Sequence, residues 1–366
     1  LGDVYKRQVL YNILKAVLRC LLFSLEDIME RNYSIDFLKI LFALSIACGH
    51  FKGSVLSSDL IVELFFILSG FFLVNSFYSG KYHGDALSYT ASRLKRIYPY
   101  YLLAFLILFI SFKSADLLHP IRFLSDFANA VPEVLLVQSI GVFSGGINYP
   151  LWQLSTLIVA SHILFALMTK DDQITLNVIC PLTAICSFTY FSNAFGTHTV
   201  EYWGGVGNFL SGPLIRAFGA LCLGMMVHRP LLALSEFIRT KLSDCAAFLL
   251  SALLIVLFWL ARDSYAAHLL FIVFLAFCLS GKGIPALFNH KFFACGEKLS
   301  LAIYLNQAAV IFPTYHNMPF LARFSDTVQT LLFIPAMLLF AVLFLFIANH
   351  LFAWIRAQMD KTSIVA

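Results

Sequence analysis

Apolar blocks of roughly membrane-spanning length, separated by short polar joints, constrain this chain more than any other feature. Hydrophobic residues make up 60% and charged residues only 12% of the 366 residues. A soluble domain of this length carries about twice that charged fraction. A helix that crosses a bilayer needs about 20 apolar residues. The sequence therefore predicts an all-α fold, a polytopic membrane helix bundle of about ten transmembrane helices surrounded by the lipid bilayer.

The joints between these blocks indicate an orientation. Lys and Arg concentrate in alternate joints, which by the positive-inside rule predicts that the N- and C-termini are both cytoplasmic. A further apolar segment, residues 131–143, is short, and we interpret it as interfacial or re-entrant; if it spans instead, every later orientation reverses. The candidate spans are residues 34–51, 59–78, 97–112, 150–168, 174–193, 213–227, 246–260, 266–280, 299–313 and 328–354.

The predicted domain organisation is one membrane domain, residues 29–358, followed by a cytoplasmic tail, residues 359–366. We interpret residues 1–28 as a doubtful N-terminal extension, because "LGDVYKRQ" resembles adapter-derived translation and Met29 offers a natural start. The eight cysteines include no CxxC pair, so no metal site is predicted. The net charge of +5 follows the loop orientation and does not indicate a nucleic-acid partner.

The first span carries three groups that a membrane helix should avoid, Asp36, Lys39 and His50. At 100° per residue, Lys39 and His50 share one face and lie about 16 Å apart along the axis. Asp36 lies one turn below Lys39 on nearly the same stripe. Charges inside a span are costly, so the stripe indicates a polar interior seam. The alternative is that Lys39 snorkels to the interface beside Asp36 as a local ion pair, while His50 reaches the opposite headgroups.

The second span, in "VELFFILSGFFL" (residues 62–73), holds a Ser-Gly pair and a carboxylate. Ser69-Gly70 indicates close helix packing, because small residues let backbones approach. A serine nucleophile is the alternative, although the first glycine of G-x-S-x-G is missing. The Glu63 carboxylate needs a partner inside the membrane, for which Lys52 and His50 are candidates.

A basic cluster, "SRLKRIYPYYLL" (residues 92–103), is predicted at the cytoplasmic start of the third span, with Pro99 in the first turn. Arg93 and Arg96 lie one turn apart, so both guanidinium groups can bind phosphate oxygens. This spacing indicates a site for a phosphate-rich cytosolic ligand. Anchoring against anionic lipid explains the cluster equally well.

Taken together, these stretches resemble the acyltransferase 3 family of membrane acyltransferases. The first-span pattern D-x-x-R…H is matched by Asp36, Lys39 and His50, and later motifs follow in the family's order. The further matches are Phe65, Phe66, Ser69, Gly70 and Phe71; Arg93, Arg96, Ile97 and Pro99; Trp152, Leu154 and Ser155; Arg216 and Gly224; and Gly296, Ser300, Ile303, Tyr304 and Leu305.

Three positions depart from the family pattern. Lys39 replaces the usual Arg and keeps the charge, but it lacks the bidentate fork. Gln307 replaces a late His, so proton transfer is not expected there. The Glu that follows Trp-x-Leu-Ser in some members is absent, and this form is associated with surface polysaccharide acyltransferases.

The resemblance implies a bacterial inner-membrane O-acyltransferase that moves an acyl group, usually acetyl, from cytosolic acyl-CoA to a hydroxyl of a surface carbohydrate. Acyl-CoA would be a donor substrate rather than a permanently bound cofactor. His50 is the implied general base or transient acyl carrier, with Lys39 and Asp36 orienting the seam. Arg93 and Arg96 would hold the coenzyme A phosphates. Residues placed along the seam or in a structural role are Glu63, Ser69, Trp152, Arg216 and Tyr304.

Two other functional classes fit the residues. A transporter or flippase for a polar or lipid-linked substrate explains polar groups inside the membrane, although the halves show no internal symmetry. An intramembrane serine hydrolase would be built on Ser69 and a histidine. A structural membrane protein is the remaining alternative.

Overall fold

The computed structural model describes residues 31–52, 57–113, 119–141, 146–195, 205–206, 210–317, 321 and 323–365. The whole of the predicted 1–28 extension, and residues 29 and 30 after it, lie outside this range. The described chain is almost wholly helical, as predicted. Its helices are α2 (Tyr33–Phe51), α3 (Ser58–Tyr78), α4 (Ala86–Lys113), α5 (Pro120–Asn129), α6 (Val131–Val134), α7 (Trp152–Lys170), α8 (Asp172–Ile174), α9 (Cys180–Phe195), α10 (Gly212–Met226), α11 (His228–Lys241), α12 (Asp244–Leu260), α13 (Ala266–Ser280), α14 (Gly296–Asn317) and α15 (Asp326–Val365).

Short elements complete the chain. Three are tight 3₁₀ segments, η2 (Tyr149–Leu151), η4 (Ile284–Phe288) and η5 (Lys291–Cys295), and η3 (Thr175–Ile179) is a π-helical turn between α8 and α9. The strands β1 (Gly205–Val206) and β2 (Leu210–Ser211) form one antiparallel pair. Helix α15 continues to Val365, so the predicted 359–366 tail is helical over most of its length.

Each of the candidate spans lies within helical structure, but not every helix reaches membrane-spanning length. Within the described ranges, six helices are long and apolar enough to cross a membrane, and seven if α10 and α11, bent by 47°, count as one broken span. The helices α12 and α13 are apolar but shorter. The structure therefore supports a multi-pass membrane protein, while the count of about ten and the cytoplasmic termini stay predictions.

Segment 131–143 does not form a spanning helix over its described residues. Only the single turn α6 is helical, and Leu136 then takes a positive φ of 58°. A bulky residue rarely adopts this left-handed conformation, and it interrupts the helix. This agrees with the interpretation of the segment as one that does not cross the membrane.

The third span begins much earlier than predicted. Asp85 accepts hydrogen bonds from the backbone N–H groups of Leu87 and Ser88, so its carboxylate caps the first turn of α4. The basic cluster is thus in the first half of a long helix, and Pro99 lies in its interior rather than in its first turn.

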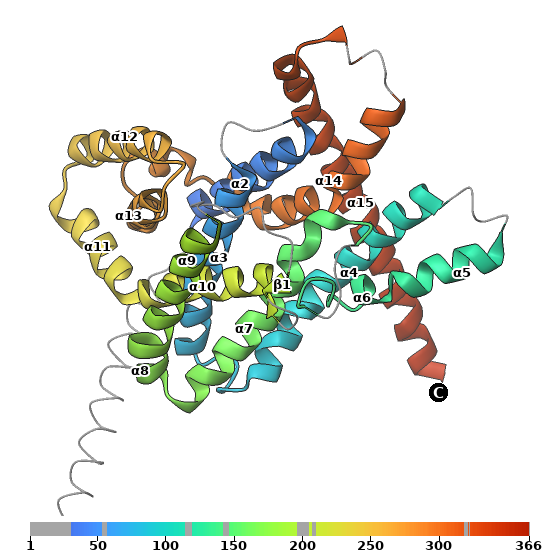
Figure 1. Ribbon diagram of the computed structural model, residues 1–366, viewed down its shortest axis with the longest axis horizontal. Coiled ribbons are helices and arrows are strands. Elements are labelled where there is room, and N and C mark those ends of the chain that lie inside the picture. Colours follow the sequence, from blue (N-terminus) through green and yellow to red (C-terminus); the bar gives the residue numbers. More distant parts are fainter. Residues whose placement is uncertain are drawn as a thin grey trace, which may run out of the picture.

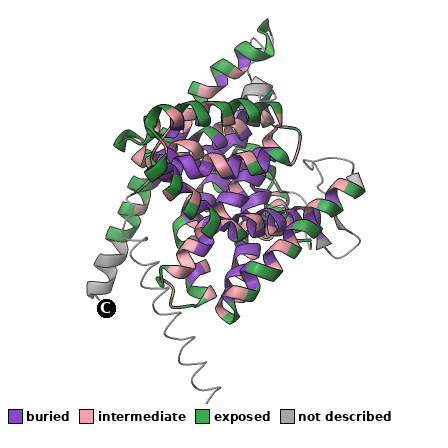
Figure 2. Ribbon diagram, turned by 90° about the vertical axis from the view of Figure 1, so that its left-hand side faces the viewer, coloured by how far each residue is buried: buried purple, intermediate pink, exposed green. Residues whose placement is uncertain are grey.

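The helices pack around a central layer formed by α2, α3, α10 and α14. Helix α10 packs against α3, α7 and α9, and α14 packs against α2 and α15. Helices α11, α12 and α13 gather on one side of this layer, with α4 and α5 on the other (Figure 1). Buried residues concentrate in the middle of the bundle and exposed ones on its outer helices (Figure 2). This distribution suits a bundle whose outer helices face lipid.

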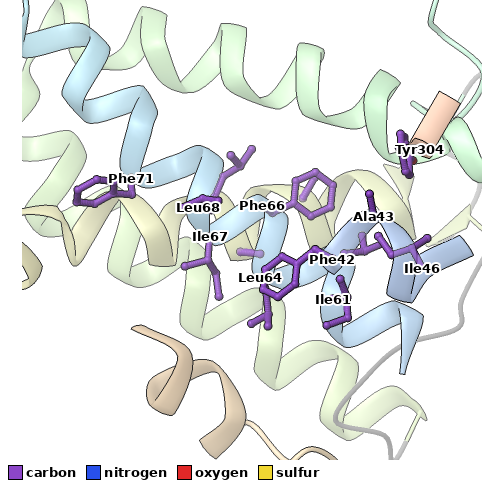
Figure 3. Close-up of a cluster of buried hydrophobic side chains, with 14 of the residues drawn as sticks. Phe42, Ala43, Ile46, Ile61, Leu64, Phe66, Ile67, Leu68, Phe71 and Tyr304 are labelled. Carbon is purple, nitrogen blue, oxygen red and sulfur yellow. The ribbon is translucent and has the colours of Figure 1, made fainter. Parts of the chain in front are cut away.

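Close packing of α3 and α10 accounts for the small residues of the second span. A Cβ atom added to Gly70 would lie 2.1 Å from the carbonyl oxygen of Leu221, and one on Gly224 only 1.9 Å from that of Ile67. Only glycine permits so close an approach, which confirms the packing interpretation of Ser69-Gly70. The α3 side chains Phe66, Leu68 and Phe71 belong to the buried cluster beside this contact (Figure 3).

Candidate active site

His50 lies in the last turn of α2, half-buried, with a defined hydrogen-bond partner. Its Nδ1 atom lies 2.8 Å from Oε1 of Gln307 on α14. The Nε2 atom of Gln307 donates to the backbone carbonyl of Tyr304, 3.0 Å away. The ring of Tyr149 packs edge-on against the imidazole, with 5.4 Å between ring centroids. The structure thus brings His50 beside Gln307, one of the positions at which the sequence departs from the pattern that it resembles.

A short loop, residues 146–151, supplies Tyr149 and is fastened to α14. Nδ2 of Asn148 donates to the carbonyl of Leu305 at 3.0 Å, and the Tyr304 hydroxyl donates to the carbonyl of Pro150. Tyr304, predicted to line the seam, therefore holds this loop in place. Trp152 follows the loop as the first residue of α7; it is buried and packs against Phe66.

Glu133, on α6, also holds the 146–151 loop in place. This residue was not singled out from the sequence. Its carboxylate accepts the backbone N–H groups of Ile147 and Asn148, at 2.7 and 2.8 Å. Burial raises the pKa of this carboxyl, and the two N–H groups oppose that shift in part. The only sequence signal was a single carboxylate inside the apolar segment 131–143.

The opposite end of α2 holds charges instead. Asp36, buried, accepts a hydrogen bond of 3.0 Å from Nε of Arg31 and lies 3.7 Å from Nζ of Lys39. Lys39 also faces the ring of Phe72, with Nζ 5.4 Å from its centroid. The local Asp36–Lys39 ion pair weighed from the sequence is therefore present. The guanidinium contact with Asp36 comes from Arg31, because a lysine carries no guanidinium group.

Arg96 joins this charged end through α14. Its NH1 atom lies 2.6 Å from Oε1 of Glu297, a residue that also interacts electrostatically with Lys39. Arg93 makes a different contact, stacking its guanidinium 4.9 Å over the ring of Tyr89. The two arginines thus share a helix face but bind different partners. We call Arg31, Asp36, Lys39, Arg96 and Glu297 the charged cluster.

The partners predicted for Glu63 are wrong. Its carboxylate lies 2.7 Å from Nε of Arg216 and contacts Nε2 of His268 on α13, whereas Lys52 pairs with Asp326 at 3.2 Å. Opposite charges inside a membrane pair with the nearest buried counter-charge, and the close contact of α3 with α10 brings Arg216 there. We call Glu63, Arg216 and His268 the buried triad.

Ser69 takes no part in a histidine pair. In the hydrogen bonds described for the structure, His50 pairs with Gln307 and His268 with Glu63. A nucleophilic serine needs a base within hydrogen-bond reach, so the geometry does not favour the hydrolase alternative. Among the residues that the structure describes, no group of three or more His, Cys, Asp or Glu side chains is arranged to hold a metal ion.

The predicted residues therefore separate into three places. Helix α14 connects two of them, because it runs along α2 and carries Glu297 near Lys39 and Gln307 beside His50. Lys39 and His50 do not meet, since eleven residues of helix separate them by about 16 Å.

Comparison with known proteins identifies the family. A family model described as an acyltransferase domain matches residues 32–350. Neither the curated proteins nor the solved structures gave a match. The family match covers nearly the whole chain and includes all the helices that carry the three places described above. The chain therefore belongs to the acyltransferase 3 family.

Proposed function

We propose that this membrane acyltransferase moves an acetyl group from cytosolic acetyl-CoA to a hydroxyl of a carbohydrate exposed on the far side of a bacterial inner membrane. The observation that carries the proposal is the placement of His50: half-buried, hydrogen-bonded on one ring nitrogen, and at the end of α2 remote from the charged cluster. The proposal therefore places the reacting group, His50, at one end of α2 and the binding site for the acyl donor, the charged cluster, at the other.

His50 is the proposed general base. A sugar hydroxyl is a poor nucleophile near neutral pH, and imidazole is the side chain best suited to take its proton there. The hydroxyl oxygen then bonds to the acetyl carbonyl carbon, and the thioester C–S bond breaks. Coenzyme A leaves as the thiolate and receives the proton from His50. The sum is one acetyl ester and one free thiol.

The charged cluster, with Arg93, is the proposed site for the coenzyme A phosphates. Arg31, Lys39, Arg93 and Arg96 outnumber Asp36 and Glu297, so the cluster carries excess positive charge. Guanidinium groups bind phosphate oxygens well, and Arg96 would exchange Glu297 for phosphate. The extended pantetheine arm would then run along α2 toward His50, in keeping with the predicted cytoplasmic side of the basic cluster.

The test uses purified protein in nanodiscs, radiolabelled acetyl-CoA, and surface polysaccharide isolated from cells that lack the gene. We expect label in the polysaccharide, as an ester released by mild base. The His50→Ala variant should lose on the order of 10²- to 10⁴-fold in rate, the usual contribution of a general base, while acetyl-CoA still binds.

Movement of substrate across the membrane without labelled product would instead support a transporter or flippase. Unchanged transfer by His50→Ala would remove His50 from the chemistry. Full activity in Ser69→Ala is also expected, because no histidine in the described part of the chain is hydrogen-bonded to Ser69.

A further inference from the structure

Gln307 is held so that its amide can point only one way. The side chain is fully buried, and its Nε2 atom lies 3.0 Å from the backbone carbonyl of Tyr304. A carbonyl oxygen only accepts hydrogen bonds, so the amide nitrogen must face it. The amide oxygen of Gln307 is therefore the atom that faces His50 at 2.8 Å.

This orientation determines which ring nitrogen of His50 carries hydrogen. The amide oxygen of Gln307 also only accepts, so Nδ1 of His50 must be the donor. A neutral imidazole carries one ring hydrogen, which leaves Nε2 with the lone pair. In the part of the chain that the structure describes, no side chain is hydrogen-bonded to Nε2 of His50.

We infer that Gln307 is a positioning residue for His50, which it holds in the tautomer whose Nε2 atom can take a proton. The inference rests on the proposed function and adds the source of the base's orientation. In the reaction, Nδ1 of His50 keeps its hydrogen and continues to donate it to the amide oxygen of Gln307. Nε2 takes the hydroxyl proton as the new C–O bond forms, and returns it to the thiolate released when the C–S bond breaks.

An amide does this differently from a carboxylate. A carboxylate beside Nδ1 also orients the ring, but its negative charge favours imidazolium. Gln307 orients the ring without adding that charge. The backbone carbonyl of Tyr304 is held in place by helix α14, and it therefore determines the orientation of both hydrogen bonds, from Gln307 to Tyr304 and from His50 to Gln307.

The kinetic test compares Gln307→Met, Gln307→Glu and the control Gln329→Met, with labelled acetyl-CoA and polysaccharide from cells lacking the gene. Gln307→Met keeps the side-chain length but removes the acceptor, and we expect on the order of a 100-fold loss of kcat, the usual effect of a misplaced catalytic group. Gln329, also buried and on α15, donates to the carbonyl of Phe324, which precedes that helix, so its loss should leave kcat unchanged.

The pH profile separates positioning from simple structural support. Gln307→Glu restores the acceptor and should keep substantial activity, but with the acidic limb of the pH–rate profile moved to higher pH, because the carboxylate favours imidazolium. Wild-type rate and pH profile in both Gln307 variants, in a protein that does transfer acetyl, would overturn the inference while leaving the proposed function intact. No transfer by the wild type would instead count against the proposed function.

A second measurement needs no substrate. Nitrogen-15 NMR of protein labelled on histidine reports which ring nitrogen is protonated, and the His50→Ala spectrum identifies the His50 signals. We expect hydrogen on Nδ1 in the wild type and a mixture of tautomers in Gln307→Met. Hydrogen on Nε2 in the wild type would overturn the inference, whether or not the protein is active.

Discussion

The His50 site and the buried triad each join a histidine to a polar partner from a distant helix, but they hold it in opposite ways. In the triad, the side chains of Glu63, Arg216 and His268 are 2%, 4% and 2% exposed, and the charges of Glu63 and Arg216 face each other. At the other site, His50 is half-buried and has a neutral partner. A histidine inside a membrane protein is therefore not a sufficient sign of a reactive site.

The two sites differ in whether a ring nitrogen of the histidine remains available to a substrate. A fully buried, charge-compensated group is stabilised where it is and exchanges protons poorly, which suits a contact that fixes α3, α10 and α13 together. A half-buried imidazole with one ring nitrogen bonded and the other open can meet a substrate. The comparison assigns stability to the triad and chemistry to His50.

The largest effect on stability is expected from Arg216→Met, which leaves the Glu63 carboxylate buried without its cation. Breaking a buried pair from one side costs about 3–5 kcal/mol, to be measured as a lower free energy of unfolding in detergent. The double variant Glu63→Leu with Arg216→Met should recover part of this loss, since the buried Glu63 charge is removed together with its cation. The recovery is incomplete, because Asp59, whose Oδ1 lies 3.6 Å from NH1 of Arg216, still loses that partner.

His50→Ala provides the contrast in the same unfolding experiment. It removes one hydrogen bond at a half-buried site, so the expected cost is only about 1 kcal/mol. An equal loss of stability in His50→Ala and Arg216→Met would contradict the division between a stabilising triad and a reactive site.

The next largest effect is expected from Glu133→Ala, which tests whether the 146–151 loop supports the His50 site. The change leaves the backbone N–H groups of Ile147 and Asn148 without their acceptor, a loss of about 1–3 kcal/mol. Because this loop places Tyr149 against His50, transfer should fall about tenfold, the effect of a change of about 1.4 kcal/mol. Glu236→Ala is the matched control, since that exposed carboxylate pairs with Arg239, three residues away on the same helix.

Glu133 should also make the stability of the protein depend on pH. Burial raises the pKa of Glu133 above its unfolded value, so the folded chain holds the proton more tightly. Its contribution is fully present at low pH and is lost as the pH rises through the raised pKa. The melting temperature of Glu133→Gln should therefore fall less than that of the wild type over this range. A steeper fall in the melting temperature of Glu133→Gln than in that of the wild type would contradict this prediction. It would show that the two backbone N–H groups affect the pKa of Glu133 more than burial does.

A smaller effect is expected at the charged end of α2. Arg93→Ala combined with Arg96→Ala should raise the KM for acetyl-CoA about tenfold, a loss of about 1.4 kcal/mol, with little change in kcat at saturating donor. Isothermal titration with coenzyme A gives the binding constant directly. Normal donor affinity in this double variant would remove the phosphates from this cluster.

The smallest effect has the opposite sign. Glu297→Gln frees Arg96 from its ion pair, in which the two side chains are 60% and 42% exposed. Such pairs contribute about 0.2–1 kcal/mol, so coenzyme A should bind up to about fivefold more tightly, measured by the same titration. Weaker binding would mean that Glu297 positions Arg96 for the donor rather than competing with it.

The sequence by itself determined the class of the molecule and the faces of its helices. Long apolar blocks can form only membrane helices, and the helical period placed Asp36 and Lys39 close enough for the ion pair that the structure contains. Ordered motifs indicated the family that the comparison then established. The small residues Ser69-Gly70 predicted close helix packing, which the structure shows at Gly70.

Only the tertiary structure decided which residues meet. The period of a helix specifies a face, but not the partner opposite it, and the decisive partners are far away in the chain: Gln307 lies 257 residues from His50, and Arg216 lies 153 residues from Glu63. Glu133 reaches its loop through a turn that no periodic pattern encodes. The place of His50 on a helix could thus be predicted from the sequence. Its partner could not, because the packing of α14 against α2 depends on the whole bundle at once.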